Sequence, residues 1–213
     1  MDNMRRLRIV IYWILKINFI KTLYYSIKFK GKVIVGKAKI KISGNSRIIF
    51  EDNNSILYIG INYSYPISCT LDMYDGTLFV SGKVFINRAV KIRIFNNSTL
   101  RIGNNSYINE GAKIYCREGI EIGAECAIAF DTLIMDNDSH QIIVDGRQIN
   151  QDKPIFIGNK VWVGGKSVIL KGSKIENNVV VGAQSLVNGS LLSNYIYGGI
   201  PAKRICCFQY WSV

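Results

Sequence analysis

The sequence predicts an all-β chain whose main unit is a parallel β-helix, and three observations support this. Large aliphatic residues recur at every sixth position near the C-terminus, a period that neither an α-helix nor a simple strand alternation produces. They are Ile157, Val163, Ile169, Ile175, Val181 and Val187. Small or slim residues follow four positions later, as expected near corners, at Val161, Ser167, Ser173, Val179 and Ser185. Glycines 158, 164 and 182 suit turns where backbone comes close or φ becomes positive.

Length and composition predict one elongated unit with two appendages. The 213 residues are 48% hydrophobic and only 20% charged, and no linker or low-complexity break interrupts them. We expect a basic amphipathic segment at 1–32, the β-helix at 33–206 with a loop at 135–154, and a tail at 207–213. The five cysteines form no Cys-x-x-Cys pattern and no signal peptide is recognisable, which favours a reducing cytoplasm.

The N-terminal segment carries nearly all of the net charge. Residues 1–47 contain 12 Lys and Arg against one acid, Asp2, whereas the remainder contains 15 basic and 14 acidic residues. The longest uninterrupted apolar run, Ile9 to Leu15, is far shorter than the roughly 20 residues of a membrane span. Two compatible interpretations stay open: a helix that caps the end of the β-helix, and a helix that lies on an anionic membrane surface. The interleaved apolar residues argue against nucleic-acid binding.

Strand-like sequence begins at Val33, is irregular at first and becomes regular at Leu78. The onsets of successive coils, Val80, Ile102, Ile122, Ile157 and Ile175, differ by 22, 20, 35 and 18 residues. One bare coil has 18 residues, so the third interval holds an excess of 17. The excess lies in MDNDSHQIIVDGRQINQDKP, residues 135–154. A loop this long leaving a regular solenoid is more often functional than decorative.

His140 is the only histidine of the chain and lies in this loop. Histidine titrates near neutral pH, so it can accept the proton of a hydroxyl that is itself a poor nucleophile. Asp136 and Asp138 either polarise His140, bind the hydroxyls of an acceptor, or belong to a solvated acidic loop. Cys126 is expected to be a small core residue, and no histidine partner is suggested for an acyl-accepting thiol.

These motifs resemble those of a known family. The hexads, the DNDSH loop, PIFIGNKVWVGG, VVVGAQSLV and GGIPAKRI together look like the hexapeptide-repeat acyltransferases, particularly sugar O-acetyltransferases of the galactoside/maltose type and those that modify bacterial capsule and lipopolysaccharide. The resemblance covers about residues 78–206. It implies a left-handed coil, a homotrimer with active sites between subunits, acetyl-CoA as donor, no metal, and a sugar hydroxyl of a surface polysaccharide as acceptor.

The resemblance also implies roles for individual residues. His140 takes the place of the general base, Asn109 that of the asparagine that orients the acceptor, and Trp162 that of an aromatic lining the cleft. The cofactor contacts would come from the backbone N–H groups near Gly164 and Gly165 as oxyanion donors, from Ala183 beside the pantetheine arm, and from Lys203 and Arg204 at the CoA phosphates.

The chain departs from the family pattern at two places. Gly165 stands where such enzymes can carry a serine, and Asn188-Gly189 stands where relatives commonly show Thr-Lys. Both departures concern CoA contacts.

Three alternatives to sugar O-acetylation are compatible with a β-helix. A γ-type carbonic anhydrase needs three zinc-binding histidines, and this chain has one. An amino-sugar N-acetyltransferase on the same scaffold would transfer the acetyl group to an amine instead of a hydroxyl. A non-enzymatic β-helix scaffold would not bind CoA. We expect a cytoplasmic location, with contact to the inner face of the cell membrane as a further hypothesis for the N-terminal segment.

Overall fold

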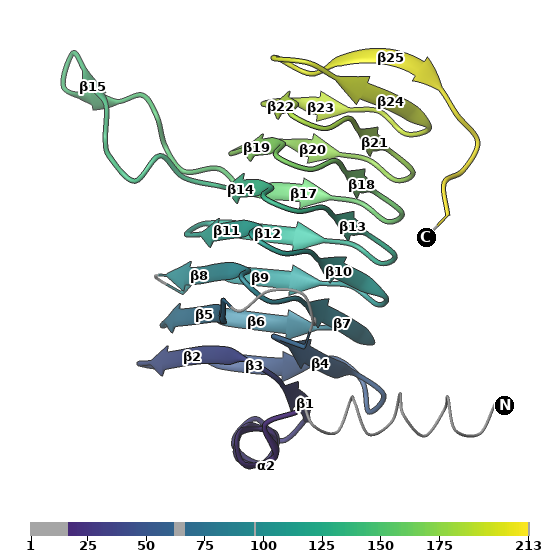
Figure 1. Ribbon diagram of the computed structural model, residues 1–213. Coiled ribbons are helices and arrows are strands. Elements are labelled where there is room, and N and C mark those ends of the chain that lie inside the picture. Colours follow the sequence, from purple (N-terminus) through teal and green to yellow (C-terminus); the bar gives the residue numbers. More distant parts are fainter. Residues whose placement is uncertain (1–16, 62–66, 96, 213) are drawn as a thin grey trace, which may run out of the picture.

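The computed structural model describes residues 17–61, 67–95 and 97–212, which form a triangular β-solenoid (Figure 1). Three sheets, each of seven or more strands, run along its axis, and their strands pair in parallel from coil to coil. The first sheet consists of β1 (Lys32–Val35), β4 (Ile56–Ile59), β7 (Lys83–Ile86), β10 (Ser106–Ile108), β13 (Ala127–Ile128), β18 (Trp162–Val163), β21 (Val180–Val181), β24 (Tyr195–Gly198) and the antiparallel β25 (Lys203–Cys207).

The two other sheets follow the same order. The second consists of β2 (Ala38–Ser43), β5 (Cys69–Tyr74), β8 (Lys91–Phe95), β11 (Lys113–Cys116), β14 (Leu133–Met135), β19 (Val168–Leu170) and β22 (Leu186–Val187). The third consists of β3 (Arg47–Phe50), β6 (Thr77–Val80), β9 (Thr99–Ile102), β12 (Gly119–Ile122), β17 (Ile155–Ile157), β20 (Lys174–Ile175) and β23 (Ser190–Leu191). We call the turns between the first and second sheets the first corner, and those between the second and third sheets the second corner.

The register stacks each inward aliphatic residue on its counterpart one coil away. Ile108 pairs with Ile86 on one side and with Ile128 on the other, and all three are fully buried. Full burial of such a side chain stabilises the fold by about 1.5–3 kcal/mol. Burial therefore accumulates along an axis, and the parallel β-helix expected from the sixfold period is confirmed.

The corners explain the small residues. The hydroxyl groups of Ser167 and Ser185 both donate to the carbonyl of Gly182, at 2.9 and 2.7 Å. A Cβ on Gly164 would lie 2.5 Å from the backbone nitrogen of Ala183, so this glycine is required by close approach of the neighbouring coil. The positive φ of the corners falls instead on other residues, such as Lys166 at 60°.

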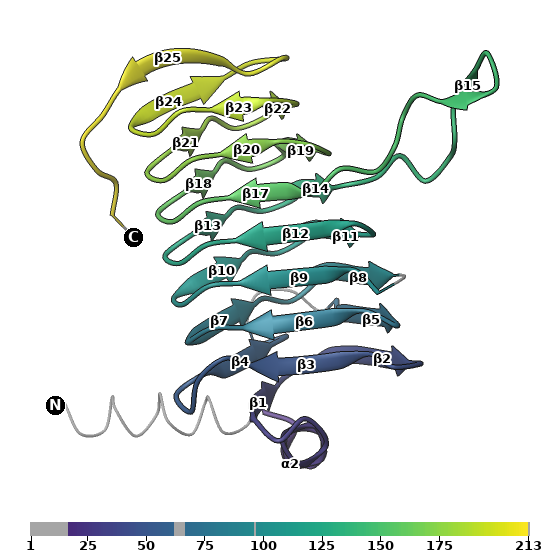
Figure 2. The same ribbon diagram turned by 180° about the vertical axis from the view of Figure 1, so that it is seen from behind.

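The solenoid is already regular in its first coil, where the sequence pattern is not. Strands β1, β2 and β3 pair in register with β4, β5 and β6. A helix, α2 (Phe19–Lys28), lies across this end of the solenoid and begins at Asn18, whose side-chain oxygen accepts from the N–H of Lys21 at 2.9 Å (Figure 2). The aromatic rings of Tyr25 and Phe29 pack against the core. No helix in the described ranges is long and apolar enough to cross a membrane.

The C-terminal residues turn back along the first sheet (Figure 1). The indole N–H of Trp211 donates to the carbonyl of Lys160 at 2.9 Å, and its ring lies 6.1 Å from that of Trp162. The domain limits expected from the sequence, 1–32, 33–206 and 207–213, stay predictions, and residues 1–16 of the first lie outside the described residues.

Candidate functional site

A long arm leaves the second corner between β14 and β17 (Figures 1 and 2). It contains a two-stranded antiparallel hairpin, β15 (Ile143–Val144) and β16 (Arg147–Gln148). The turn between these strands is Asp145-Gly146, with φ values of 49° and 72°. An Asp-Gly pair with two positive φ angles is a favoured two-residue hairpin turn, so the local sequence folds the tip of the arm.

Asp136 anchors the root of the arm to the coil below. Its carboxylate is fully buried and accepts hydrogen bonds from three successive backbone N–H groups, those of Arg117, Glu118 and Gly119, at 2.8–3.1 Å. It also accepts from the side-chain amide of Asn137 at 3.0 Å. A carboxylate held by this many N–H donors has a fixed position. Its oxygens are committed to the protein, which favours a positioning role over the acceptor contact that the sequence suggested.

A second layer of contacts joins the two stems of the arm. The side-chain nitrogen of Asn150 donates to the carboxylate of Asp138 at 2.9 Å and to the carbonyl of His140 at 2.8 Å. Its side-chain oxygen accepts from the N–H of Ile142 at 2.7 Å. Lys171, from the coil above, pairs with Asp138. The hydrogen bonds from Lys171 and then Asn150 hold the pKa of Asp138 below its ordinary range.

His140 lies in a polar pocket of about 280 Å³ between the arm and the second corner. Its lining consists of Arg117, Glu118, Ser139, His140, Gln141, Gln148, Gln151 and Asp152. The imidazole makes no hydrogen bond within the described part of the chain, so it can accept a proton from a bound hydroxyl. Amides and charged groups of both signs around one imidazole suit a ligand that carries several hydroxyls.

A second group of the residues singled out in the sequence lies at the first corner. Successive coils place Asn109 under Ala129 and Gly164 in one column, and Glu110 under Phe130, Gly165 and Ala183 in the next. The Asn109 side-chain oxygen accepts from the amide of Asn87 at 2.7 Å. Near this corner, a groove of about 440 Å³ is lined by Ile67, Ala89, Glu110, Gly111, Lys113, Phe130 and Asp131.

The two glycines of the column differ in what their backbones can offer. The N–H of Gly164 donates to the carbonyl of Val181 at 2.7 Å, as part of the coil-to-coil ladder. The N–H of Gly165 donates to no acceptor among the described residues, which makes it the better candidate for an oxyanion donor. A Cβ on Gly165 would lie 2.8 Å from the ring of Phe130. Phe130 therefore occupies the space that a serine would need here.

The remaining cofactor candidates lie on or beside the first sheet. Trp162 points outward from β18 and is 44% exposed, beside Trp211. Lys203 and Arg204 are exposed on β25 at the end of the sheet, and the Arg204 guanidinium lies 4.8 Å from the centre of the Tyr195 ring. Trp162 lies at one level along the solenoid axis and Lys203 and Arg204 at another, on the sheet that borders the first corner. An elongated cofactor bound along this axis would pass all three.

The structure thus gathers the candidates into two groups at different corners. His140, Asp136 and Asp138 lie at the second corner, whereas Asn109, Gly164, Gly165 and Ala183 lie at the first. None of the latter lines the His140 pocket. Within one chain the candidate base and the candidate oxyanion donor are therefore separated by the second sheet.

Sequence reasoning missed several residues that shape these two groups. Arg117 and Glu118 enter the His140 pocket from the preceding coil, and Lys171 reaches the arm from the following one. Only the register of the coils reveals these neighbours. Phe130 offered a signal, because it is a large aromatic residue in a corner position that the next two coils fill with Gly165 and Ala183.

Three of the five thiols lie in the core. Burial raises the pKa of Cys116 to about 12 and that of Cys126 to about 11, and Cys69 is raised further. Such thiols stay protonated near neutral pH and are poor nucleophiles. The described residues contain no group of three or more His, Cys, Asp or Glu that could hold a metal ion.

Comparison with known proteins supports an acyltransferase. Residues 154–189 match the family described as bacterial transferase hexapeptide (six repeats). WbbJ of Escherichia coli K12, whose name describes a lipopolysaccharide biosynthesis O-acetyl transferase, is 29% identical over 177 residues, which are 76% of this chain and 79% of WbbJ.

Solved structures agree on the fold. The polysialic acid O-acetyltransferase OatWY is 28% identical with a TM-score of 0.62, over 82% of this chain and 87% of its own. A variant of AntD, an N-acyltransferase from Bacillus cereus in complex with dTDP-4-amino-4,6-dideoxyglucose and coenzyme A, has a TM-score of 0.54 at 21% identity, over 80% of this chain and 83% of its own. The resemblance to hexapeptide-repeat acyltransferases is confirmed, and with it the left-handed β-helix.

Proposed function

We propose that this hexapeptide-repeat chain transfers an acetyl group from acetyl-CoA to a hydroxyl of a bacterial surface-polysaccharide sugar, of the capsule or the lipopolysaccharide. The observation that carries the proposal is the polar pocket around His140, which lies on an arm anchored by the buried Asp136. The names of WbbJ, a lipopolysaccharide biosynthesis O-acetyl transferase, and OatWY, a polysialic acid O-acetyltransferase, support the choice of acceptor class. Cytoplasmic acetyl-CoA as donor implies a cytoplasmic location.

The chemistry is a direct transfer in a ternary complex. The acceptor hydroxyl attacks the thioester carbonyl while the imidazole of His140 takes its proton, a step typically worth about 10²- to 10⁴-fold in rate. The N–H of Gly165 meets the negative charge that develops on the carbonyl oxygen. The C–S bond then breaks, and the CoA thiolate leaves and takes up a proton. No enzyme thiol is needed, in keeping with the raised pKa values of the buried cysteines.

Separation of the two groups of residues favours a site shared between subunits. In a homotrimer with parallel axes, the His140 arm of one subunit would face the first corner of its neighbour. Acetyl-CoA would then lie along that corner, with Trp162 and Ala183 beside its arm and Lys203 and Arg204 near its phosphates. Asn109 would orient the acceptor from the same corner.

The proposal is tested by release of free CoA from acetyl-CoA with a panel of saccharides. We expect acceptor-dependent release from the wild type, a loss of most of it in His140→Ala, and CoA binding that is equal in both. Val144→Ala, on the same arm but outside the pocket lining, controls for damage to the arm. Full turnover by His140→Ala would contradict the role of the base.

The acceptor panel also separates the alternatives. An amino-sugar N-acetyltransferase, a reaction class related to that of AntD, would acetylate amines in preference to hydroxyls. A β-helix scaffold without catalysis would not bind CoA at all. Transfer to hydroxyl acceptors alone therefore supports the proposal against both.

A further inference from the structure

An exposed apolar face lies on α2, at the end of the solenoid farthest from β25 (Figure 1). Five neighbouring side chains form it, and each residue is between 55% and 84% exposed. They are Phe19, Ile20, Leu23, Tyr24 and Ile27. Single apolar residues on a surface are ordinary, but a continuous face of this kind marks an interaction site.

Contacts on the opposite side fix the orientation of this face. The hydroxyl of Thr22 accepts from the N–H of Val35 at 3.0 Å, and that of Tyr25 donates to the carbonyl of Ile40 at 3.2 Å. Ser26 exchanges two hydrogen bonds with the backbone of Val33, each 3.1 Å long. Because these three side chains are tied to the first coil, the helix cannot roll to bury its apolar side.

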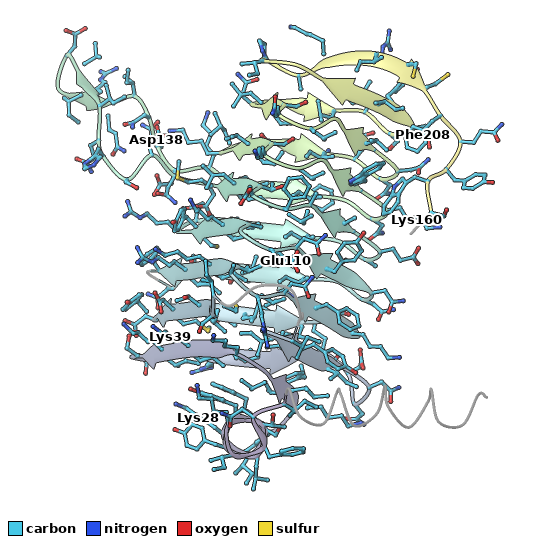
Figure 3. The ribbon with its side chains drawn as sticks, viewed as in Figure 1. Lys28, Lys39, Glu110, Asp138, Lys160 and Phe208 are labelled. Atoms are coloured by element: carbon cyan, nitrogen blue, oxygen red, sulfur yellow. The ribbon has the colours of Figure 1, made fainter. Side chains whose placement is uncertain are left out.

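The chain segment that carries and follows the face is basic. Residues 17–50 contain eight Lys and Arg and no Asp or Glu. Lys28 borders the face, with its ammonium group 5.9 Å from the centre of the Tyr24 ring. Lys39 and Lys41 are exposed on β2, and Figure 3 shows Lys28 and Lys39 at the same end of the molecule. A partner that fits this surface needs an apolar region bordered by negative charge.

We propose that α2 docks this protein on an anionic lipid bilayer. The apolar side chains enter the boundary between headgroups and acyl chains, and the lysines meet the lipid phosphates. A second copy of the chain fits the surface less well, since a symmetric pairing would bring Lys28 and the neighbouring lysines of one subunit close to those of the other. The docking goes beyond the proposed function and does not depend on it.

The arrangement has one consequence for the proposed function. Strand β14, at the root of the His140 arm, lies four strands away from β2 in the second sheet. At about 4.8 Å per strand, the pocket stands roughly 20 Å along the axis from the docked end. An acceptor saccharide anchored to the same membrane would be extended past the first coils to reach it.

Flotation of the full-length protein with lipid vesicles tests the docking. The vesicles contain phosphatidylcholine alone or mixed with phosphatidylglycerol. The test variant is Ile20→Gln, Leu23→Gln and Ile27→Gln combined. The control carries Leu192→Gln, Ile200→Gln and Ile205→Gln, three residues near the other end that are also more than half exposed. We expect the wild type and the control to float with the anionic vesicles only, and the test variant to bind about a hundredfold less tightly.

A charge variant separates the two contributions. Lys39→Gln with Lys41→Gln is expected to weaken binding to anionic vesicles by roughly fivefold for each lysine that meets the surface. Equal flotation of the wild type and the apolar variant, or no flotation of the wild type, would overturn the proposal. So would a test variant that keeps its flotation but loses mass in light scattering, because the face would then belong to a second copy. Far-UV circular dichroism checks that all variants are folded.

Discussion

Replacing Asp136 by asparagine should loosen the His140 arm without unfolding the solenoid. The carboxylate accepts from three backbone N–H groups and one side-chain amide, all within 2.8–3.1 Å. An asparagine has one oxygen and one NH₂ group, so one of its two positions must direct a donor at another donor. If the NH₂ group replaces Oδ2, it faces the N–H groups of Glu118 and Gly119. If it replaces Oδ1, it faces the N–H of Arg117 and the amide of Asn137.

The free-energy cost of Asp136→Asn follows from the hydrogen bonds that it removes. A hydrogen bond to a charged group contributes about 1.5–3 kcal/mol, and a buried donor left unpaired costs about 1–3 kcal/mol more. We therefore expect the closed arm to lose about 3 kcal/mol, which is more than a hundredfold in the equilibrium between a fixed and a loosened root. Only the turn at 117–119 of one coil takes part in these bonds, so the midpoint of global unfolding should change much less.

Two measurements on Asp136→Asn check this reasoning. Hydrogen exchange at the N–H groups of residues 117–119 should become faster, and kcat for acetyl transfer should fall by roughly 10- to 100-fold. The matched control is Asp145→Asn, the same chemical change at the exposed tip of the same arm. Unchanged exchange together with a raised acceptor KM would refute the positioning role and support the acceptor contact that the sequence suggested.

Three further predictions concern other parts of the chain. Gly165→Ser should destabilise the protein by about 1–3 kcal/mol because its Cβ meets the ring of Phe130, and adding Phe130→Ala should restore the melting temperature; no rescue would contradict this contact. The pKa of Asp138 is lower in the folded protein than its ordinary value of 3.8, so its contacts stabilise the arm fully above that pH. This stabilisation is lost as pH falls through the lower folded value, so proteolysis of the arm should increase near pH 3 but not at pH 5. A thiol reagent at pH 8 should modify Cys206 and Cys207 quickly, whereas fast reaction of a third cysteine would contradict the burial of the others.

The sequence period was sufficient for the core but not for the pocket. Inward residues such as Ile108 and Ile128 can be assigned from the sixfold spacing alone, because every coil repeats the same environment. The arm has no period, so its sequence does not reveal that Asp136 points down into the turn at 117–119. That contact depends on the register between two coils and on the direction of one side chain.

For the first coils, the sequence pattern predicted less regularity than the structure has. Their sequence looks irregular before Leu78, yet their strands pair as regularly as later ones. Longer strands, such as β2 with six residues, replace the compact hexads there. Strand length therefore disguised the repeat, whereas the alternation of buried and exposed residues was retained.

Because the candidate base and the candidate oxyanion donor lie at different corners, mixed subunits provide a further test. His140→Ala and Asn109→Ala should each lose activity alone, because each removes one side of the proposed shared site. If every site combines His140 of one subunit with Asn109 of its neighbour, random trimers of the two variants contain some sites with both residues intact. For an equal mixture about a quarter of the sites are intact, so refolding the variants together should recover roughly that share of wild-type turnover. A mixture as inactive as its components would mean that both residues act within one chain, and the arm would then have to fold back across the second sheet.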